Sequence, residues 1–395
     1  MRTLNILAVV WLSLLLCCCE ERGVPESGKV TLQLLFDTAQ NAEPTDAVVK
    51  VSFMSNDGVV YNYERRIDEP MTFDVASGIY NITARIKYSA DNVVHLYSGQ
   101  LSELILKDGV RESCNVPMNY SKTGQLIISE IYFSGCIGAS GTKYFDDQYL
   151  ILHNNSADTV YLDGVCVAFI SPMRASSKSA FVDYYTDRTV AYNFLWSFPG
   201  SGTEYPLAPG ADVVIAPNCV NHIALGNVAS VDLSKEGYWA CYDVNANLTK
   251  QSPPATPDKK MLSLIWRNGS ATACTCSVLD PAFVVFKIKG DVETYINEYS
   301  CFNPQQPNSS QLYLGVPYKW VYDAVECFDA TNRYKRLSSV VDGGYAFLPN
   351  GSGSAMSVHR KVDEQASAEM GFTVYQDSNN SSEDFEVCYP PSLKK

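Results

Sequence analysis

LIISEIYFSG, at residues 126–135, and QYLILHNNSADTVYLDGVCVAF, at residues 148–169, carry the clearest strand pattern in this sequence. They contain three apolar runs of strand length, each rich in Ile, Leu, Val and Tyr. Clusters of Gly, Asn, Ser and Asp separate the runs and are typical of turns. This pattern predicts a β-sandwich that begins near residue 126.

Short motifs within these stretches resemble the opening of a lamin-tail domain, which is an immunoglobulin-like sandwich. The first strand of that family carries an Ile-Ser-Glu triplet, here Ile128, Ser129 and Glu130. A later strand ends in a Leu-x-Asn turn, as at residues 152–154, and the next closes on Leu-x-Gly, as at residues 162–164. The resemblance implies a sandwich that binds or connects other molecules, because no common chemistry follows from the fold.

The carboxyl-terminal part of the chain continues this resemblance. LAPGADVVI, at residues 207–215, is similar to the lamin-tail step in which Leu-x-Pro-Gly turns into an apolar strand. Residues 333–344, 357–361 and 380–392 look like the closing strands of lamin-tail-related bacterial domains. The whole resembles a poorly characterised family of Gram-negative surface lipoproteins, a domain of unknown function with a lamin-tail-like sandwich over residues 122–391.

One segment of this sandwich, about residues 218–300, departs from the repeated strand-and-turn pattern and is interpreted as an insertion. Long irregular segments in compact domains are commonly functional or disordered. We expect its aromatic residues Tyr238, Trp239, Tyr242 and Trp266 to form a binding surface. The alternative is that these side chains pack inward and that the insertion is an extra layer of core.

Residues 27–121 precede the sandwich and alternate short β-type runs with turns. The candidate strands are residues 30–36, 48–54, 59–65, 78–88 and 101–107. Asn56, Asp57 and Gly58 favour a tight hairpin between the second and third runs. This segment resembles transthyretin-like or carboxypeptidase-regulatory-like modules, which implies a small sandwich that acts as a spacer. The fold class is therefore all-β, with two sandwich domains.

The amino terminus has the pattern of a lipoprotein export signal, residues 1–19, followed by an anchor linker at residues 20–26. An apolar run ends at Cys17, Cys18 and Cys19, where such signals place the acylated cysteine. We expect Cys18 or Cys19 to be lipidated, with Cys17 as the fallback. The acidic pair at residues 20–21 resembles the signals that carry lipoproteins to the outer face of the outer membrane. A plain secretory signal with incidental cysteines is the alternative.

Composition indicates a globular exported chain with 46% hydrophobic residues. Its net charge of −13 and the absence of a basic patch argue against binding to nucleic acid. Thirteen cysteines minus the three at the signal leave ten, an even number that is compatible with disulfides in an exported protein. We expect at least two disulfides, and buried free thiols are the alternative.

Signatures of catalysis are absent from the sequence, which lacks HExxH, GxSxG and Walker motifs. No catalytic residue, metal site or cofactor is expected, and the four histidines are far apart in the chain. The Cys-Thr-Cys motif at residues 274–276 is a weak metal signal. The oxygen-rich loop at residues 377–384 lacks the glycine of an EF-hand, so it is interpreted as a polar loop.

The sequence leaves the function open among several non-enzymatic roles. We expect a lipid-anchored binding or accessory protein of the cell surface and outer membrane, with an outer-membrane barrel protein of a nutrient importer or a surface glycan as partner. Tyr184, Tyr185, Tyr192 and Trp196 could stack on a sugar, although strand packing also explains them. A structural or adhesive module is the alternative. A buried pair of carboxylates with perturbed pKa values would instead favour catalysis.

Overall fold

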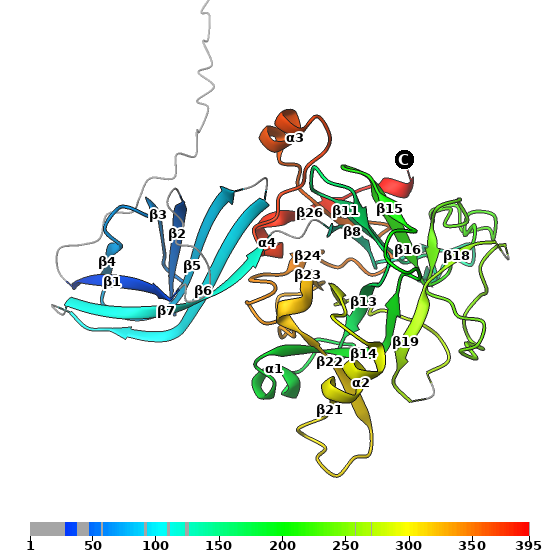
Figure 1. Ribbon diagram of the computed structural model, residues 1–395, viewed down its shortest axis with the longest axis horizontal. Helices are drawn as coiled ribbons and strands as arrows, with labels where there is room; N and C mark the ends of the chain where they lie inside the picture. Colours follow the sequence, from blue (N-terminus) through cyan, green and yellow to red (C-terminus); the bar gives the residue numbers. More distant parts are fainter. Residues whose placement is uncertain are drawn as a thin grey trace, which may run out of the picture. The chain divides into compact units, whose positions relative to one another are not determined.

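The structure, a computed structural model, describes residues 28–37, 47–56, 58–90, 93–108, 111–122, 126–256, 258–269 and 271–394. The expected signal, linker and lipidation site at Cys17, Cys18 and Cys19 therefore lie outside the described residues. Strands dominate and helices are few, which confirms the all-β fold class (Figure 1). The chain divides into two compact units, the first made of Met1–Arg85 and Gln100–Pro117, the second of Ile86–Gly99 and Met118–Lys395.

Seven strands form the amino-terminal sheet, in the order β3-β2-β5-β6-β7-β1-β4. The strands are β1 Lys29–Asp37, β2 Val48–Ser55, β3 Val60–Arg66, β4 Thr72–Ala76, β5 Gly78–Ala90, β6 Val93–Leu106 and β7 Arg111–Lys122. The sequence patterns predicted five of them and missed β4 and β7. The expected hairpin joins β2 to β3, and Gly58 has the positive φ (88°) that such a turn favours.

This sheet folds over on itself. The β2 and β4 strands lie near its opposite ends, yet the rings of Phe53 and Phe73 are only 5.6 Å apart. The edge strands also meet, because the hydroxyl of Tyr63 on β3 donates to the carbonyl oxygen of Asp74 on β4. Alternate residues of the strands, such as Val49, point into the enclosed core, as the two-residue period of a strand requires.

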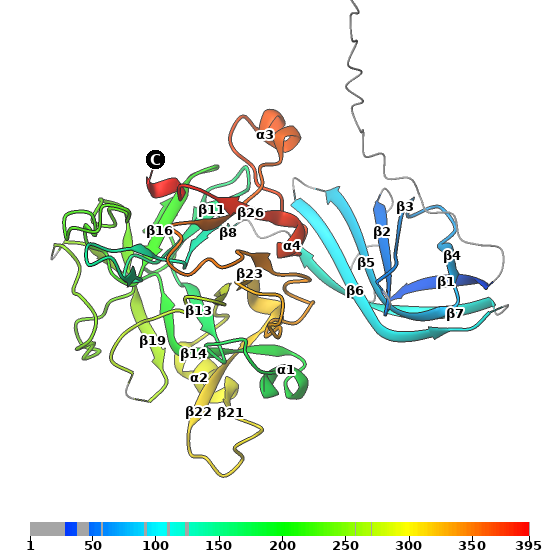
Figure 2. The ribbon, with the colours of Figure 1, turned by 180° about the vertical axis from the view of Figure 1, so that it is seen from behind.

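Two sheets form the core of the second unit (Figures 1 and 2). The first sheet contains, in order, β18 Lys260–Met261, β17 Trp239–Ala240, β16 Asp212–Ala216, β11 Tyr149–Asn154, β8 Leu126–Tyr132, β25 Ser357–Arg360 and β26 Phe385–Cys388. The second contains β21 Ser300–Phe302, β22 Leu312–Pro317, β14 Arg188–Ser197, β13 Val165–Ile170, β20 Ala282–Lys287, β23 Val321–Phe328 and β24 Ala346–Phe347. A further strand, β19 Ser263–Arg267, pairs with β14.

Successive side chains along a strand point to opposite faces of its sheet, and in both sheets apolar side chains are buried on both faces. In β13, Val167 faces the core between the sheets, whereas the neighbouring Ala168 faces the opposite side. In β11, Leu152 faces the same inner core and Ile151 faces outward. Strands buried on both faces read as continuous apolar runs, which is why these stretches stood out in the sequence.

The structure corrects the interpretation of residues 218–300 as an insertion. β20, near the carboxyl end of that segment, is a central strand of the second sheet and pairs with both β13 and β23. The earlier part of the segment adds β17 and β18 to the first sheet and packs residues such as Val231 and Leu233 over its outer face. Most of the segment is therefore part of the sandwich.

Helices are short and lie around the sheets. They are α1 Ala180–Tyr184, α2 Val292–Tyr299, α3 Glu364–Met370 and α4 Ser381–Asp384, with 3-10 turns η1 Tyr318–Trp320 and η2 Ser392–Lys394. Two small two-stranded ladders pair β9 Cys136–Ile137 with β10 Lys143–Tyr144 and β12 Val160–Tyr161 with β15 Pro206–Leu207. Among the described residues, no helix has the length and apolarity needed to cross a membrane.

The residues of the lamin-tail resemblance have structural roles. Glu130 is fully buried and accepts hydrogen bonds from the Tyr149 hydroxyl (3.0 Å), the Ser357 hydroxyl (2.5 Å) and the Ser392 amide (3.0 Å). It therefore ties the first strand of the sandwich to the end of the chain. In the Leu-x-Gly motif, Asp163 accepts from backbone amides of the loop that precedes β15.

Candidate interaction surface

Tyr238, Trp239, Tyr242 and Trp266, which were expected to form a binding surface, are all buried or half-buried. Trp239 is 2% exposed and its ring packs edge-to-face on Phe198 in the inner core. Tyr238 and Tyr242 pack against the apolar layer on the outer face of the first sheet, and Trp266 packs against the core on the far side of the second. Trp239 therefore follows the inward-packing alternative, and Tyr238, Tyr242 and Trp266 are half-buried against the apolar layers.

The four aromatic residues considered for sugar stacking, Tyr184, Tyr185, Tyr192 and Trp196, lie in three different places. Trp196 is 0% exposed and stacks on Phe194, so it belongs to the core. Tyr192 lines a small pocket together with Phe169 and Met173. Tyr184 and Tyr185, by contrast, lie at the surface at the end of α1.

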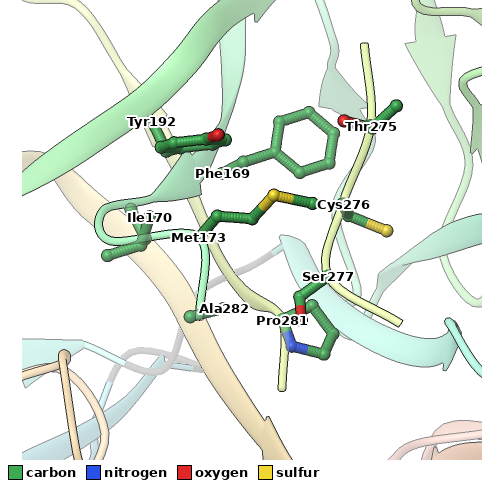
Figure 3. Close-up of a pocket in the computed structure, with 9 residues that line it drawn as sticks. All are labelled: Phe169, Ile170, Met173, Tyr192, Thr275, Cys276, Ser277, Pro281 and Ala282. Carbon is green, nitrogen blue, oxygen red and sulfur yellow. The ribbon is translucent and has the colours of Figure 1, made fainter. Parts of the chain in front are cut away.

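The pocket beside Tyr192 is too small for an organic ligand. It offers about 10 Å³ to the centre of a water molecule, which is room for one water. Met173 extends across it toward Cys276 (Figure 3). A second pocket, between Tyr149 and Phe283 within the sandwich, is of the same size. Sites for nutrient-sized molecules are far larger, roughly 300–1,000 Å³.

An exposed aromatic cluster forms where α1 meets β21, at the lower end of the second unit in Figure 1. We define this aromatic cluster as Tyr184, Tyr185 and Phe302. Tyr184 is 56% exposed, and its ring centroid lies 4.9 Å from that of Tyr185 and 5.6 Å from that of Phe302. Phe302 is itself 37% exposed. Three aromatic side chains thus meet at a surface instead of in the core.

Local structure accounts for the position of each ring. The side chain of Ser179 caps α1 by accepting from the amide of Phe181, which starts a single helical turn that ends at Tyr184. Phe181 faces inward and packs on Tyr313 of β22, with centroids 5.0 Å apart. The rings that follow it on the helix therefore point outward, next to the end of β21.

The charged residues Arg188 and Asp187 pack beside the cluster. Arg188 makes a two-pronged ion pair with Asp187, with both N–O distances 2.8 Å, and this pairing lowers the pKa of Asp187 and raises that of Arg188. The guanidinium lies over the rings of Tyr185 (5.8 Å) and Tyr299 (4.9 Å). Burial raises the pKa of Tyr185, so its hydroxyl keeps its proton and donates to the carbonyl oxygen of Phe302 at 3.0 Å.

The buried cysteines in the described part of the chain do not form the expected framework of at least two disulfides. Eight of the ten are buried free thiols, namely Cys136, Cys166, Cys219, Cys241, Cys274, Cys276, Cys301 and Cys327. Burial raises the pKa of the Cys276 thiol, which therefore stays protonated at neutral pH. The alternative holds: these residues serve as small apolar core side chains.

The oxygen-rich loop at residues 377–384 is occupied by a side chain of the protein itself. Its Asp384 and Asp377 accept hydrogen bonds from the Arg360 guanidinium, at 3.1 and 3.3 Å. The same guanidinium makes two bonds of 2.8 and 2.9 Å to Asp323 of β23. In the part of the chain that the structure describes, no group of three or more His, Cys, Asp or Glu side chains could hold a metal ion.

Buried carboxylates with perturbed pKa values do occur, and all belong to hydrogen-bond networks. Burial raises the pKa of Asp323 to about 7, against the opposing effect of Arg360, and also raises that of Asp384. Burial also raises the pKa of Asp342, which accepts hydrogen bonds from the backbone N–H and the hydroxyl of Ser381. Neither described pocket is lined by any of these groups.

Sequence reasoning missed Phe302 and the loop that follows it. FNPQQPNSSQ, at residues 302–311, lacks the apolar pattern of a strand, and its one motif is the Asn-x-Ser sequon at Asn308, which does not indicate a binding site. Its signal is compositional, since one aromatic residue is followed by amide and hydroxyl side chains. The three-dimensional contact with Tyr184 has no counterpart in the sequence spacing.

Residues 208–392 match DUF4876, a family of proteins of unknown function. A solved structure of a DUF4876 family protein from Bacteroides thetaiotaomicron VPI-5482 is similar to this chain, with 27% sequence identity and a TM-score of 0.59, over 91% of this chain and 94% of that chain. A proposed adhesin from Bacteroides ovatus ATCC 8483 aligns with 9% identity and a TM-score of 0.21, over 74% and 83% of the two chains. None of the curated proteins matches. The expected resemblance to a poorly characterised family with a β-sandwich fold is confirmed.

Proposed function

We propose that this chain is a lipid-anchored protein of the bacterial cell surface that binds a partner without transforming it. The observation that carries the proposal is the aromatic cluster of Tyr184, Tyr185 and Phe302, in which Tyr184 and Phe302 are exposed and Tyr185 is half-buried, although aromatic rings are strongly favoured in cores and interfaces. Surface aromatic groups held in fixed positions are typical centres of binding energy. An accessory role beside an outer-membrane nutrient importer is a narrower form of this function.

The placement of the titratable groups supports a non-enzymatic role. Asp323 and Asp384 have raised pKa values, as catalytic carboxylates often do, but both are bound to Arg360 and buried. His153 and His222 are also buried, with hydrogen bonds to both ring nitrogens of each. These groups therefore serve packing and specificity of the fold.

The anchoring part of the proposal rests on the cysteine cluster at the end of the apolar signal. Replacing Cys17, Cys18 and Cys19 by Ser in the full-length chain should release it from the membrane fraction and abolish metabolic acyl labelling. Retained labelling and unchanged membrane fractionation would refute lipidation at these residues.

The binding part is tested by site-specific photo-crosslinking of the full-length protein in its native cell envelope. A photoreactive phenylalanine analogue replaces Tyr184 or Phe302, and the matched control is Tyr334, which is 49% exposed and lies outside the cluster. We expect the same discrete adduct from the first two positions and not from the control. Identical adduct patterns at all three positions would mean that the cluster is not a contact site.

A further inference from the structure

We propose that the aromatic cluster and the adjoining loop bind an uncharged carbohydrate chain. This inference rests on the proposed function and names the ligand class for the same surface. Three features support it: the geometry of the rings, the chemistry of the loop between β21 and β22, and the pairing of the nearby charges.

The rings are arranged so that they can stack on a flat ligand. Tyr184 meets Tyr185 at an interplanar angle of 72° and Phe302 at 67°. Tyr184 is 56% exposed and Phe302 is 37% exposed despite these contacts, so part of each of these two rings remains accessible to a ligand. Sugar rings present flat patches of C–H groups, and aromatic faces with their partial negative charge attract such patches.

The loop beside Phe302 offers the hydrogen-bonding groups that sugar hydroxyls need. It projects at the lower end of the unit in both views (Figures 1 and 2). Between β21 and β22 it carries the amide or hydroxyl side chains of Asn303, Gln305, Gln306, Asn308, Ser309, Ser310 and Gln311. Amides both donate and accept hydrogen bonds, as do sugar hydroxyls, and the loop contains no charged residue.

Two pairs of opposite charge lie next to the cluster in the sequence and in space. Lys178 lies 3.0 Å from Asp183, and Arg188 lies 2.8 Å from Asp187. A polyanionic partner would require a net positive surface, which these pairs do not provide. The local charge balance therefore favours an uncharged ligand over an acidic polysaccharide.

The surface is largely organised before a ligand binds. The Tyr185 hydroxyl donates a hydrogen bond to the Phe302 carbonyl oxygen. The loop also contains two turns, in which the backbone N–H of Gln306 donates to the carbonyl oxygen of Asn303 and that of Ser309 donates to the carbonyl oxygen of Gln306. Gln311 further donates to the side chain of Asn268 at 2.9 Å. Side chains and loops that are already ordered lose less entropy on binding.

The test is affinity electrophoresis of the full chain through gels that contain one polysaccharide each. The probes are neutral dextran, mannan, xylan and mixed-linkage glucan, with polygalacturonate and heparin as anionic probes. We expect retardation by at least one neutral polysaccharide and by neither anionic one. Tyr184→Ala and Phe302→Ala should each weaken binding roughly ten-fold, whereas Tyr184→Phe and the control Tyr334→Ala should bind as the unmodified protein does.

Three outcomes would overturn the inference: no neutral polysaccharide retards the protein, only anionic ones do, or the Ala substitutions leave retardation unchanged. Circular dichroism of each variant shows whether it is folded. The photo-crosslinking experiment separates the two proposals. If Tyr184 still forms its discrete adduct but the adduct is a protein, the binding surface stands and the carbohydrate ligand class is wrong.

Discussion

Replacing Arg360 by Met is expected to destabilise the carboxyl-terminal sandwich strongly. The guanidinium is 2% exposed and bonds to Asp323, to Asp384 and to the carbonyl oxygen of Ile128 (2.8 Å). It therefore joins β25 to β8, to β23 and to the segment around α4. Burial alone would lower the pKa of Arg360, but the surrounding aspartates raise it, so the side chain stays charged.

The magnitude follows from what the substitution leaves behind. Met keeps most of the apolar stem but leaves buried carboxylates without their counter-charge. Breaking a buried ion pair by removing one partner costs about 3–5 kcal/mol. Because whole domains are stable by only about 5–15 kcal/mol, this loss is a large fraction of the total. Adding Asp323→Asn to Arg360→Met should recover part of it, since one uncompensated carboxylate disappears.

Urea unfolding followed by tryptophan fluorescence reports on this unit alone. Trp196, Trp239, Trp266 and Trp320 all lie in it, and the fifth tryptophan, Trp11, lies outside the described residues, in the stretch expected to be an export signal. The control is Lys361→Met at the next residue, where an exposed ammonium donates one hydrogen bond to the Glu383 carbonyl oxygen and about 1 kcal/mol or less is at stake. If both variants unfold at the same urea concentration, the ion-pair network does not contribute as described.

Three further outcomes follow from buried groups. Ser392→Ala removes the hydroxyl that donates to the buried Glu130 carboxylate but keeps the backbone N–H that also donates to it, and should cost about 1–3 kcal/mol of unfolding free energy; an unchanged urea midpoint would contradict that role. Burial lowers the pKa of His222, so the stability that it contributes is complete above about pH 6.5 and is lost as the pH falls through the folded-state pKa, by at most about 1.4 kcal/mol per pH unit. His222→Gln should therefore show a shallower loss of stability between pH 7 and pH 5 than the unmodified protein, whereas parallel curves would remove His222 from the account. Alkylation in denaturant without reductant should add at least eight labels by intact mass, and a smaller number would show that some of the eight buried thiols are oxidised.

Strand positions could be predicted from the sequence because they depend on local pattern. The runs around Ile128, Leu152 and Val167 are apolar on both faces, and the structure places each of them in a central strand. The Gly58 hairpin followed from the conformational freedom that a turn needs. In both cases the local structure is determined by a few residues that are adjacent in the sequence.

The candidate site could not be predicted in the same way, because exposure depends on partners that are distant in the chain. Trp239 and Tyr184 both lie in aromatic stretches of the sequence, yet the first fills the core and the second projects into solvent. Phe302 reaches Tyr184 only because β21 and β14 lie on either side of β22 in the second sheet. Cysteine number was misleading for a related reason, since an even count does not reveal whether the thiols are close enough to bond.

The position of β8 between β11 and β25 has a consequence for the timing of folding. Ile131, near the start of the sandwich, pairs with Val358, near its end, so the first sheet is incomplete until almost the whole chain has been synthesised. Contacts so far apart in sequence form slowly, because a long loop must close before they stabilise anything. Until then β8 presents an open strand edge beside apolar faces, which is a template for aggregation. We expect the growing chain to need a chaperone that shields this edge until residues 357–388 are available to cover it.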